Sequence, residues 1–234
     1  MALDTVLIID DEPKIRALLR EAFLDEAGQV FEASTGRAAI ELAEAKCPDL
    51  LVLDLGLPDM EGIEVCRAIR AWSSAPILVL SARASEDEKA ALLDAGADDY
   101  ITKPFSVVEF QARVRAQARR SQMGPVSGTS ITMGELTIDT TRRLVMRAGV
   151  EVHLTPTEWG VLRVLIAHAD RPVTHAQLFK AVWGSAAGDA QLYLRVYVAH
   201  LRRKLEVDPY QPRLILTEPG VGYRLVLCRE AYGE

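Results

Sequence analysis

Two spacings of apolar residues alternate along the first half of the chain. Continuous apolar runs at residues 6–9, 50–53 and 77–80 are hydrophobic on both faces, which is typical of parallel strands covered by helices. A shorter strand, the fifth and last of this half, is predicted at residues 100–101. Apolar residues recur at helical spacing between the runs and predict helices over residues 15–23, 37–46, 61–70, 86–95 and 107–119. The alternation predicts an α/β fold, a (βα)5 doubly wound sheet.

The second half has a different pattern. It predicts short strands over residues 135–139, 143–147, 151–154, 213–217 and 222–226, and helices over residues 157–168, 175–183 and 191–205. Turn residues between the last two strands predict a C-terminal hairpin, so this half has the outline of an α+β winged helix-turn-helix module. Residues 121–130 are rich in Ser, Gly and Pro and fit a linker between two domains, residues 1–120 and 131–234.

The composition is that of a globular protein, with 49% hydrophobic and 26% charged residues among 234. No apolar run approaches the ~20 residues that cross a bilayer, and Asp4 lies where a signal peptide would carry positive charge. We therefore expect a cytoplasmic protein without a membrane partner. An odd number of widely spaced cysteines (Cys47, Cys66 and Cys228) favours free thiols in a reducing compartment.

The net charge of −6 argues against nucleic-acid binding when the chain is taken as a whole. The two halves differ, however. Residues 1–120 contain 14 Lys and Arg against 22 Asp and Glu, a net charge of −8, whereas residues 121–234 contain 13 against 11, a net charge of +2. This asymmetry favours separate roles for the two parts.

Chemically reactive residues follow four of the predicted strands. They are, in strand order, Asp10 and Asp11, Asp54, Ser81, and Lys103. Because parallel strands meet at one edge of the sheet, these side chains are expected to lie together. Gathered carboxylates favour a hard cation such as Mg²⁺, beside which a carboxylate can attack phosphorus and form an aspartyl phosphate. Acids after strands are often only helix caps, but residues of matching chemistry at four strand ends favour a site.

Five short motifs carry a resemblance to a known family. They are Ile-Ile-Asp-Asp-Glu at 8–12, Leu-Asp-Leu-Gly-Leu-Pro-Asp at 53–59, Leu-Ser-Ala at 80–82, Gly-Ala-Asp-Asp-Tyr at 96–100 and Lys-Pro-Phe at 103–105. With these motifs, residues 1–120 resemble a response-regulator receiver domain. The resemblance implies that a sensor histidine kinase phosphorylates Asp54. It also implies one Mg²⁺ per domain, held by Asp10, Asp11, Asp54 and the backbone carbonyl of Gly56.

The same resemblance implies roles around the phosphoryl group. Ser81 and Lys103 would bind it, and Tyr100 would change rotamer when Ser81 is drawn inward. Tyr100 could equally be a half-buried tyrosine of an edge strand. Arg83 could tune the lifetime of the phosphoryl group or be a solvated loop charge.

The last predicted helix, residues 191–205, suggests a DNA contact. Leu194, Val198, Leu201 and Leu205 fall on one face, so Val196, Ala199, His200 and Arg203 are expected to point away, with Arg195 and Arg202 on the flanks. Such a helix could lie in the major groove of promoter DNA, and Arg224 in the hairpin could reach a minor groove or a phosphate. A solvated basic helix end is the simpler explanation for residues 202–204 alone.

Motifs at residues 154–158, 182–184, 198–205 and 220–224 resemble the OmpR/PhoB-type winged helix, in which Thr155 or Thr157 would cap the first helix. Residues 53–59, 71–76, 80–83 and 193–200 further resemble the subgroup that regulates high-affinity potassium uptake. A different regulon stays open, since Val196, Val198 and Ala199 match that subgroup only approximately.

The family resemblance also implies a homodimer, formed on phosphorylation through a charged face of the receiver. The residues concerned are Lys89, Asp98, Asp99, Glu109, Arg113 and Arg120. Solvated helix faces would explain each charge singly. RNA polymerase is a further possible partner. The rival functions are a receiver-gated enzyme, for which the second half offers no catalytic cluster, and a receiver joined to a protein-binding module.

Overall fold

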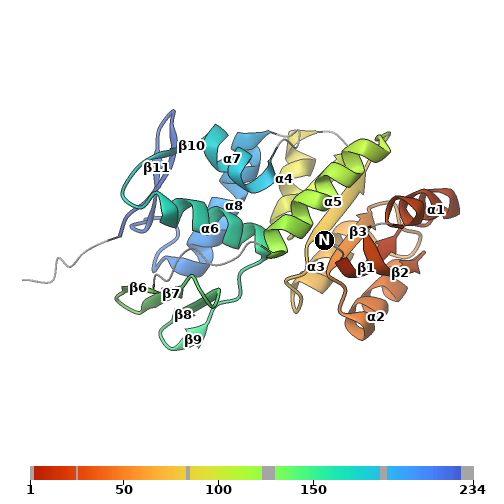
Figure 1. Cartoon of the computed structure of the whole chain (residues 1–234), viewed down its shortest axis with the longest axis horizontal. Helices are drawn as coiled ribbons and strands as arrows, with labels where there is room; N and C mark the ends of the chain where they lie inside the picture. Colours follow the sequence, from red (N-terminus) through yellow and green to blue (C-terminus); the bar gives the residue numbers. More distant parts are fainter. Residues whose placement is uncertain (1–2, 25, 83–84, 123–129, 185–188, 228–234) are drawn as a thin grey trace, which may run out of the picture. The chain divides into compact units, whose positions relative to one another are not determined.

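The computed structural model describes residues 3–24, 26–82, 85–122, 130–184 and 189–227, with the side chains of 120–122 left out. The chain divides into two compact units, Met1–Arg119 and Arg120–Glu234 (Figure 1). The predicted linker, residues 121–130, falls at the start of the second unit. Its ends belong to a helix that reaches Gln122 and a strand that begins at Ser130.

The first unit contains a five-stranded parallel sheet in the order β2-β1-β3-β4-β5. Its strands are β1 (Leu3–Ile9), β2 (Ala27–Ala33), β3 (Leu50–Asp54), β4 (Ile77–Ser81) and β5 (Asp99–Thr102). Its helices are α1 (Pro13–Ala22), α2 (Gly36–Lys46), α3 (Gly62–Arg70), α4 (Glu86–Asp94) and α5 (Val107–Gln122). The predicted (βα)5 doubly wound fold is confirmed.

Hydrophobic burial explains the position of this sheet. Every residue of β3 and β4 is buried, as continuous apolar runs require when helices cover both faces. On one face, side chains of the central strands pack with α1 and α5, where Phe23 and Phe110 meet edge to face with ring centroids 5.4 Å apart. Only Ala33 of the edge strand β2 is buried, which explains why no apolar run marks that strand in the sequence.

Two close approaches set the loop after β3. A Cβ at Gly62 would lie 2.6 Å from the backbone oxygen of Asp54 and from the Cα of Leu55, so α3 can begin directly against the end of β3. On the other side, the Asp59 carboxylate accepts hydrogen bonds from the backbone N–H groups of Gly36 (2.7 Å) and Arg37 (3.0 Å) at the start of α2. The loop beside Asp54 is thus held at both ends.

The described residues of the second unit form two antiparallel sheets and three helices. The first sheet has the order β6-β7-β8-β9 and the second the order β10-β12-β11. Their strands are β6 (Ser130–Met133), β7 (Leu136–Asp139), β8 (Leu144–Arg147), β9 (Val150–Glu151), β10 (Val173–Thr174), β11 (Ile215–Glu218) and β12 (Gly222–Leu225). The helices are α6 (Pro156–Ala167), α7 (His175–Trp183) and α8 (Ala190–Leu205). The α+β winged helix-turn-helix outline is confirmed, with β6 and β10 added and the strand expected at 151–154 moved to Val150–Glu151.

Helices α6, α7 and α8 each begin with a residue whose side chain caps the backbone N–H groups of the first turn. Thr155 forms a capping box with Glu158 at α6, and Thr174 forms one with Gln177 at α7. Asp189 accepts from two backbone N–H groups at the start of α8. Of the two threonines expected to cap α6, the structure therefore selects Thr155.

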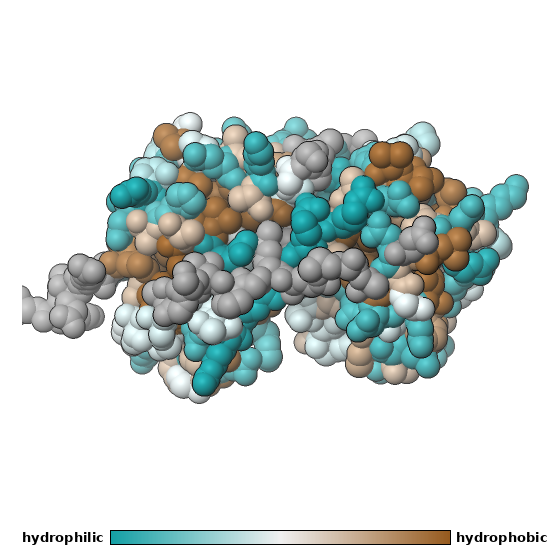
Figure 2. All heavy atoms as spheres, in the orientation of Figure 1, coloured by the Kyte–Doolittle hydropathy of each residue, from teal (hydrophilic) through white to brown (hydrophobic). Residues whose placement is uncertain are grey.

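In the part of the chain that the structure describes, no helix is long and apolar enough to cross a bilayer. Figure 2 shows hydrophilic and hydrophobic residues interspersed over the visible face of each unit.

Candidate functional site

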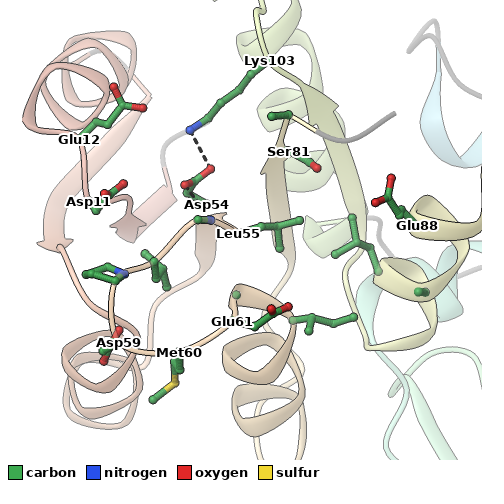
Figure 3. A pocket seen from close by; sticks show the side chains of 18 residues that line it. Asp11, Glu12, Asp54, Leu55, Asp59, Met60, Glu61, Ser81, Glu88 and Lys103 are labelled. Atoms are coloured by element: carbon green, nitrogen blue, oxygen red, sulfur yellow. Dashed lines mark hydrogen bonds and ion pairs between the residues drawn. The ribbon is translucent and has the colours of Figure 1, made fainter. Parts of the chain in front are cut away.

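The residues that follow four strands of the first unit lie together at one edge of the sheet. Asp54 ends β3, Ser81 ends β4, and Lys103 follows β5. Together with Asp11 they line a cleft of about 920 Å³, whose lining residues are drawn in Figure 3. Asp10, directly after β1, is fully buried behind this cleft. The predicted gathering of these five residues is therefore present.

Lys103 bridges two carboxylates at the floor of the cleft. Its Nζ lies 2.7 Å from Oδ1 of Asp54 and 3.0 Å from Oδ2 of Asp10 (Figure 3 draws the Asp54 contact). Burial acts to lower the pKa of Lys103, but its hydrogen bonds to Asp54 and Asp10 outweigh burial and raise that pKa above the ordinary lysine value. The ammonium therefore stays charged at neutral pH and compensates the buried acids.

Asp10 is the most deeply buried acid of the site. Burial raises its pKa above the ordinary aspartate value, although hydrogen bonds from Lys103 and from the backbone N–H of Glu12 (2.9 Å) act in the opposite direction. A carboxylate in this position is stable only with a positive charge nearby. The site is therefore built to hold cationic charge.

The donor atoms at this edge fit a hard metal ion. Asp10, Asp11 and Asp54 each offer a carboxylate oxygen, and these oxygens all lie within 4.8 Å of one another. Asp11 is exposed and so reachable from solvent. An all-oxygen donor set on an open cleft suits Mg²⁺, which keeps several waters when bound. The backbone N–H of Gly56 donates to Oδ2 of Asp54 (3.0 Å) and orients that carboxylate.

The two predicted switch residues are both buried. Ser81 is 1% exposed and Tyr100 is 6% exposed, so Tyr100 is not the half-buried edge tyrosine of the alternative interpretation. The Nζ atom of Lys89, on α4, lies 5.3 Å from the centroid of the Tyr100 ring. This cation–π contact joins α4 to Tyr100 on β5. Arg83 lies outside the described residues.

Three of the six charges assigned to a dimer face need a correction. Asp98, Asp99 and Arg113 are buried inside the first unit. Asp98 pairs with Arg70 (2.6 Å), whereas Arg113 pairs with Asp99 (2.7 Å) and with Glu109 (3.2 Å). Buried charges need partners within the fold, and these pairs supply them. In this conformation Asp98, Asp99 and Arg113 form ion pairs inside the first unit and are not surface charges.

The other three differ from these. Lys89 and Glu109 are partly exposed, and the side chain of Arg120 is not among those the structure describes. Of the six predicted charges, Lys89 and Glu109 are therefore the two whose described side chains are partly exposed, and Glu109 also pairs with Arg113 within the unit.

The face of α8 that the sequence expects to point outward is only partly exposed. Arg195 and Arg203 are exposed, but Val196 is buried because α8 packs against both α6 and α7. The side chain of His200 is only 13% exposed, and its Nδ1 lies 3.8 Å from Oε1 of Glu158 on α6. The outward placement of Val196 is therefore wrong, and His200 is largely covered.

Two further arginines expected to contact DNA have partners inside the fold. Arg202 binds the backbone oxygen of Ile215 and the hydroxyl of Thr217 on β11. Arg224 forms an ion pair with Glu218 across the hairpin (2.6 Å). Arg195 and Arg203 are thus the better placed of the expected DNA contacts.

The sequence did not single out Asp59 or Glu158. Hydrogen bonds from the backbone N–H groups of Arg37 and Gly36 lower the pKa of Asp59 below the ordinary aspartate value. Glu158 is buried, and Oε2 of Glu158 lies 2.7 Å from the ammonium of Lys204. Both contacts join segments far apart in the chain, so no local spacing could have predicted them.

Comparisons with known proteins agree with both units. The family described as "Response regulator receiver domain" matches residues 6–115, and the family described as "Transcriptional regulatory protein, C terminal" matches residues 149–225. The chain is 46% identical over 222 residues to the KDP operon transcriptional regulatory protein KdpE of Escherichia coli (strain K12), covering 95% of this chain and 99% of that protein.

Two other similar proteins extend the comparison. The chain is 41% identical over 223 residues to the response regulator MprA of Mycolicibacterium vanbaalenii, covering 94% of this chain and 96% of that protein. Among solved structures, it is similar to the response regulator DrrB, a Thermotoga maritima OmpR/PhoB homolog, with a TM-score of 0.52 and 29% identity over 96% of this chain and 99% of that one.

Proposed function

This chain belongs to the two-component response regulators of the OmpR/PhoB type, and from that premise we propose that phosphorylation of Asp54 makes it a dimer that controls potassium-uptake genes. Family membership makes it a phosphorylation-dependent transcriptional regulator with a DNA-binding domain, and not an enzyme with a separate substrate. The bridge from Lys103 to Asp54 and Asp10 is the observation that carries the assignment of the phosphorylation site.

The proposed reaction is a phosphoryl transfer from a histidine of the sensor kinase. An oxygen of Asp54 attacks phosphorus, a P–O bond forms as the P–N bond breaks, and the histidine nitrogen keeps the electron pair and takes up a proton. Lys103, already bound to Asp54, stabilises the negative charge of the phosphoryl group, and the Ser81 hydroxyl donates a hydrogen bond to it. A Mg²⁺ ion held by Asp10, Asp11, Asp54 and the Gly56 carbonyl would neutralise charge on the phosphoryl oxygens.

Asp54→Asn tests the phosphorylation site. We expect the full chain to gain the mass of one phosphoryl group when incubated with acetyl phosphate and Mg²⁺, and the variant to gain none. Asp59→Asn, also in the cleft but bound to the start of α2, is the matched control and should still be labelled. Labelling of the Asp54→Asn variant would contradict the assignment.

The proposed dimer forms through α4, β5 and α5. Lys89 and Glu109 support this choice, because they carry opposite charges and are partly exposed on α4 and α5, and Lys89 also contacts Tyr100. Sedimentation velocity with Mg²⁺ and beryllofluoride, which mimics the phosphoryl group, should show a dimer. Lys89→Glu should weaken that dimer and Lys89→Glu with Glu109→Lys should restore it. A monomer under all conditions would contradict the proposal.

The potassium regulon is proposed from the similarity to KdpE, which extends over nearly all of both chains. Deleting the gene should abolish induction of potassium-transport genes in potassium-poor medium, and a neighbouring sensor-kinase gene would support the pairing. A different regulon is the second candidate, because MprA is also similar over nearly its whole length. Unchanged potassium-gene transcription in the deletion strain would favour that candidate.

Further partners belong to the same proposal. The protein would meet its kinase and its promoter in the cytoplasm. When it is bound to the promoter, its second unit would contact RNA polymerase. A pull-down of polymerase by the protein on promoter DNA would test that contact. Binding that does not depend on the second unit would count against it.

A further inference from the structure

The guanidinium of Arg202 is bound to the C-terminal hairpin. Its Nε and Nη2 atoms lie 2.9 Å and 2.6 Å from the backbone oxygen of Ile215, and Nη2 lies 2.9 Å from the hydroxyl oxygen of Thr217. Both acceptors are on β11, which is an edge strand of its sheet. Carbonyl groups on the outer side of an edge strand lack a sheet partner, and Arg202 supplies one.

The neighbours of Arg202 on α8 have other roles. Lys204 donates to the Glu158 carboxylate (2.7 Å) and to the backbone oxygen of His153 (3.0 Å), so it fastens α8 to the start of α6. Arg203 is exposed. The run Arg202-Arg203-Lys204 is therefore not a single basic surface, because two of its three charges bind other elements of the second unit.

A second attachment lies one turn further on. Glu206 ends α8 and is buried, and its carboxylate accepts hydrogen bonds from the backbone N–H groups of three consecutive residues, Arg213 (3.0 Å), Leu214 (2.9 Å) and Ile215 (2.9 Å). Glu206 thus binds the residues that lead into β11 and its first residue, and Arg202 binds that first residue, Ile215, and also Thr217. Two attachments to one strand fix both the distance and the direction of the hairpin relative to α8.

We infer that Arg202 is a positioning residue for DNA binding, which holds the β11–β12 hairpin at a fixed offset from α8 so that both can contact one duplex. A guanidinium that turned toward a phosphate would leave the Ile215 carbonyl without its partner. A hairpin that is already fixed in the free protein loses less conformational entropy when DNA binds, so the free energy of binding is more favourable. The inference rests on the proposed DNA-facing role of α8.

The test compares the same substitution at two arginines of the second unit, Arg202 and the exposed Arg142, in the full chain. The probe is a duplex selected from a random pool for binding to the unsubstituted protein. A single phosphate contact tolerates lysine, whereas a forked bond to two acceptors does not. Arg202→Lys should therefore weaken binding about tenfold, while Arg142→Lys, at an arginine whose side chain is 80% exposed on the turn between β7 and β8, stays within about twofold. Retained binding by Arg202→Lys would overturn the inference.

Thr217→Val provides a second variant that leaves every charge in place. It should weaken binding in the same direction as Arg202→Lys, and the double variant should lose less than the product of the two single losses, because both remove one contact. Hydroxyl-radical footprints should lose protection beside the hairpin and keep it beside α8. A neutral Thr217→Val, or losses that multiply, would contradict the positioning role even if Arg202→Lys were poorly folded.

A different result would contradict the underlying proposal that α8 faces DNA. If α8 does not face DNA, Arg195→Ala combined with Arg203→Ala will leave the affinity unchanged, which overturns the proposed face together with the inference. If that pair weakens binding and Thr217→Val does not, the face stands and the positioning role alone is refuted.

Discussion

At the scale of single residues, Lys103 illustrates how one side chain stabilises a site that would otherwise repel itself. It lies between Asp54 and Asp10, at 2.7 Å and 3.0 Å. Because its pKa is raised in the folded chain, its pairing stabilises the fold at every pH below the ordinary lysine pKa and is lost as pH rises through the raised value. The charge of Lys103 is therefore constant over the physiological range.

Lys103→Met should destabilise the protein in a pH-dependent way. Without the ammonium, the pKa of the buried Asp10 carboxyl should rise further above its ordinary value. A raised aspartate pKa means that the folded state binds protons more readily than the unfolded state. The loss of folding stability is therefore complete at pH values above the pKa of Asp10 in the folded state, and it disappears as the pH falls below the pKa of Asp10 in the unfolded state. Urea unfolding from pH 8 to pH 4 should show the difference from wild type shrinking, and added Mg²⁺ should reduce it at pH 8. A pH-independent difference would contradict this account.

Two cysteines in the described part of the chain differ sharply in their environment. Cys66 is buried, and this burial raises the pKa of its thiol to about 12, while Cys47 is exposed. Thiolate is the reactive form, so in a Cys228→Ser background iodoacetamide at pH 8 should modify Cys47 at least ~1,000-fold faster than Cys66. Peptide mapping before and after denaturation measures both rates. Equal rates in the native protein would show that the packing around α3 opens readily.

At the scale of elements, Gly222 shows why the short strand β10 exists. A Cβ at this position would collide with the backbone oxygen of Val173, so the β10–β12 contact depends on glycine. Gly222→Ala should destabilise the second unit by roughly 3 kcal/mol through overpacking. Gly149→Ala, where a Cβ meets nothing within 4 Å but φ is +78°, should cost only about 1 kcal/mol. Urea denaturation of both variants tests the difference, and equal losses would contradict it.

The apolar pattern marked most clearly the strands that are buried on two faces, and it missed the edge strand β2 and the short strand β10. β1, β3 and β4 are marked by continuous apolar runs, and their ends located the site. β2 lies at a sheet edge with one buried residue, and β10 has only two residues, so neither has a pattern to detect. Their positions are fixed by tertiary contacts, such as that of Gly222.

The charges were harder to assign than the apolar residues. Helical spacing placed Arg202 beside an outward face, but its partner on β11 is set by how the hairpin folds back on α8. The same holds for Asp98 and Arg113, whose partners lie on α3 and β5. A charged side chain is long enough to bind several neighbours, so its partner depends on tertiary structure that spacing does not contain.

At the scale of the whole molecule, the net charge of −6 is the sum of an acidic first unit and a slightly basic second unit, which have different roles. The acidic first unit gathers carboxylates around Lys103, and the second has two exposed arginines, Arg195 and Arg203, on α8. Since two of the basic residues of α8 bind within the fold, one copy of the second unit can neutralise few phosphates. A single copy should therefore bind DNA weakly, and affinity should depend on bringing two copies to one duplex.

The dependence of binding on salt tests whether phosphorylation acts through dimerisation. The slope of log affinity against log salt concentration reports how many phosphates are neutralised, and two copies should neutralise twice as many as one. On a duplex with two half-sites about one helical turn apart, Mg²⁺ and beryllofluoride should therefore roughly double the slope. On a duplex with one half-site, the slope should not change. A rise in affinity without a rise in slope would mean that phosphorylation instead releases a second unit that was held back, because the same contacts would then form more often and not in greater number.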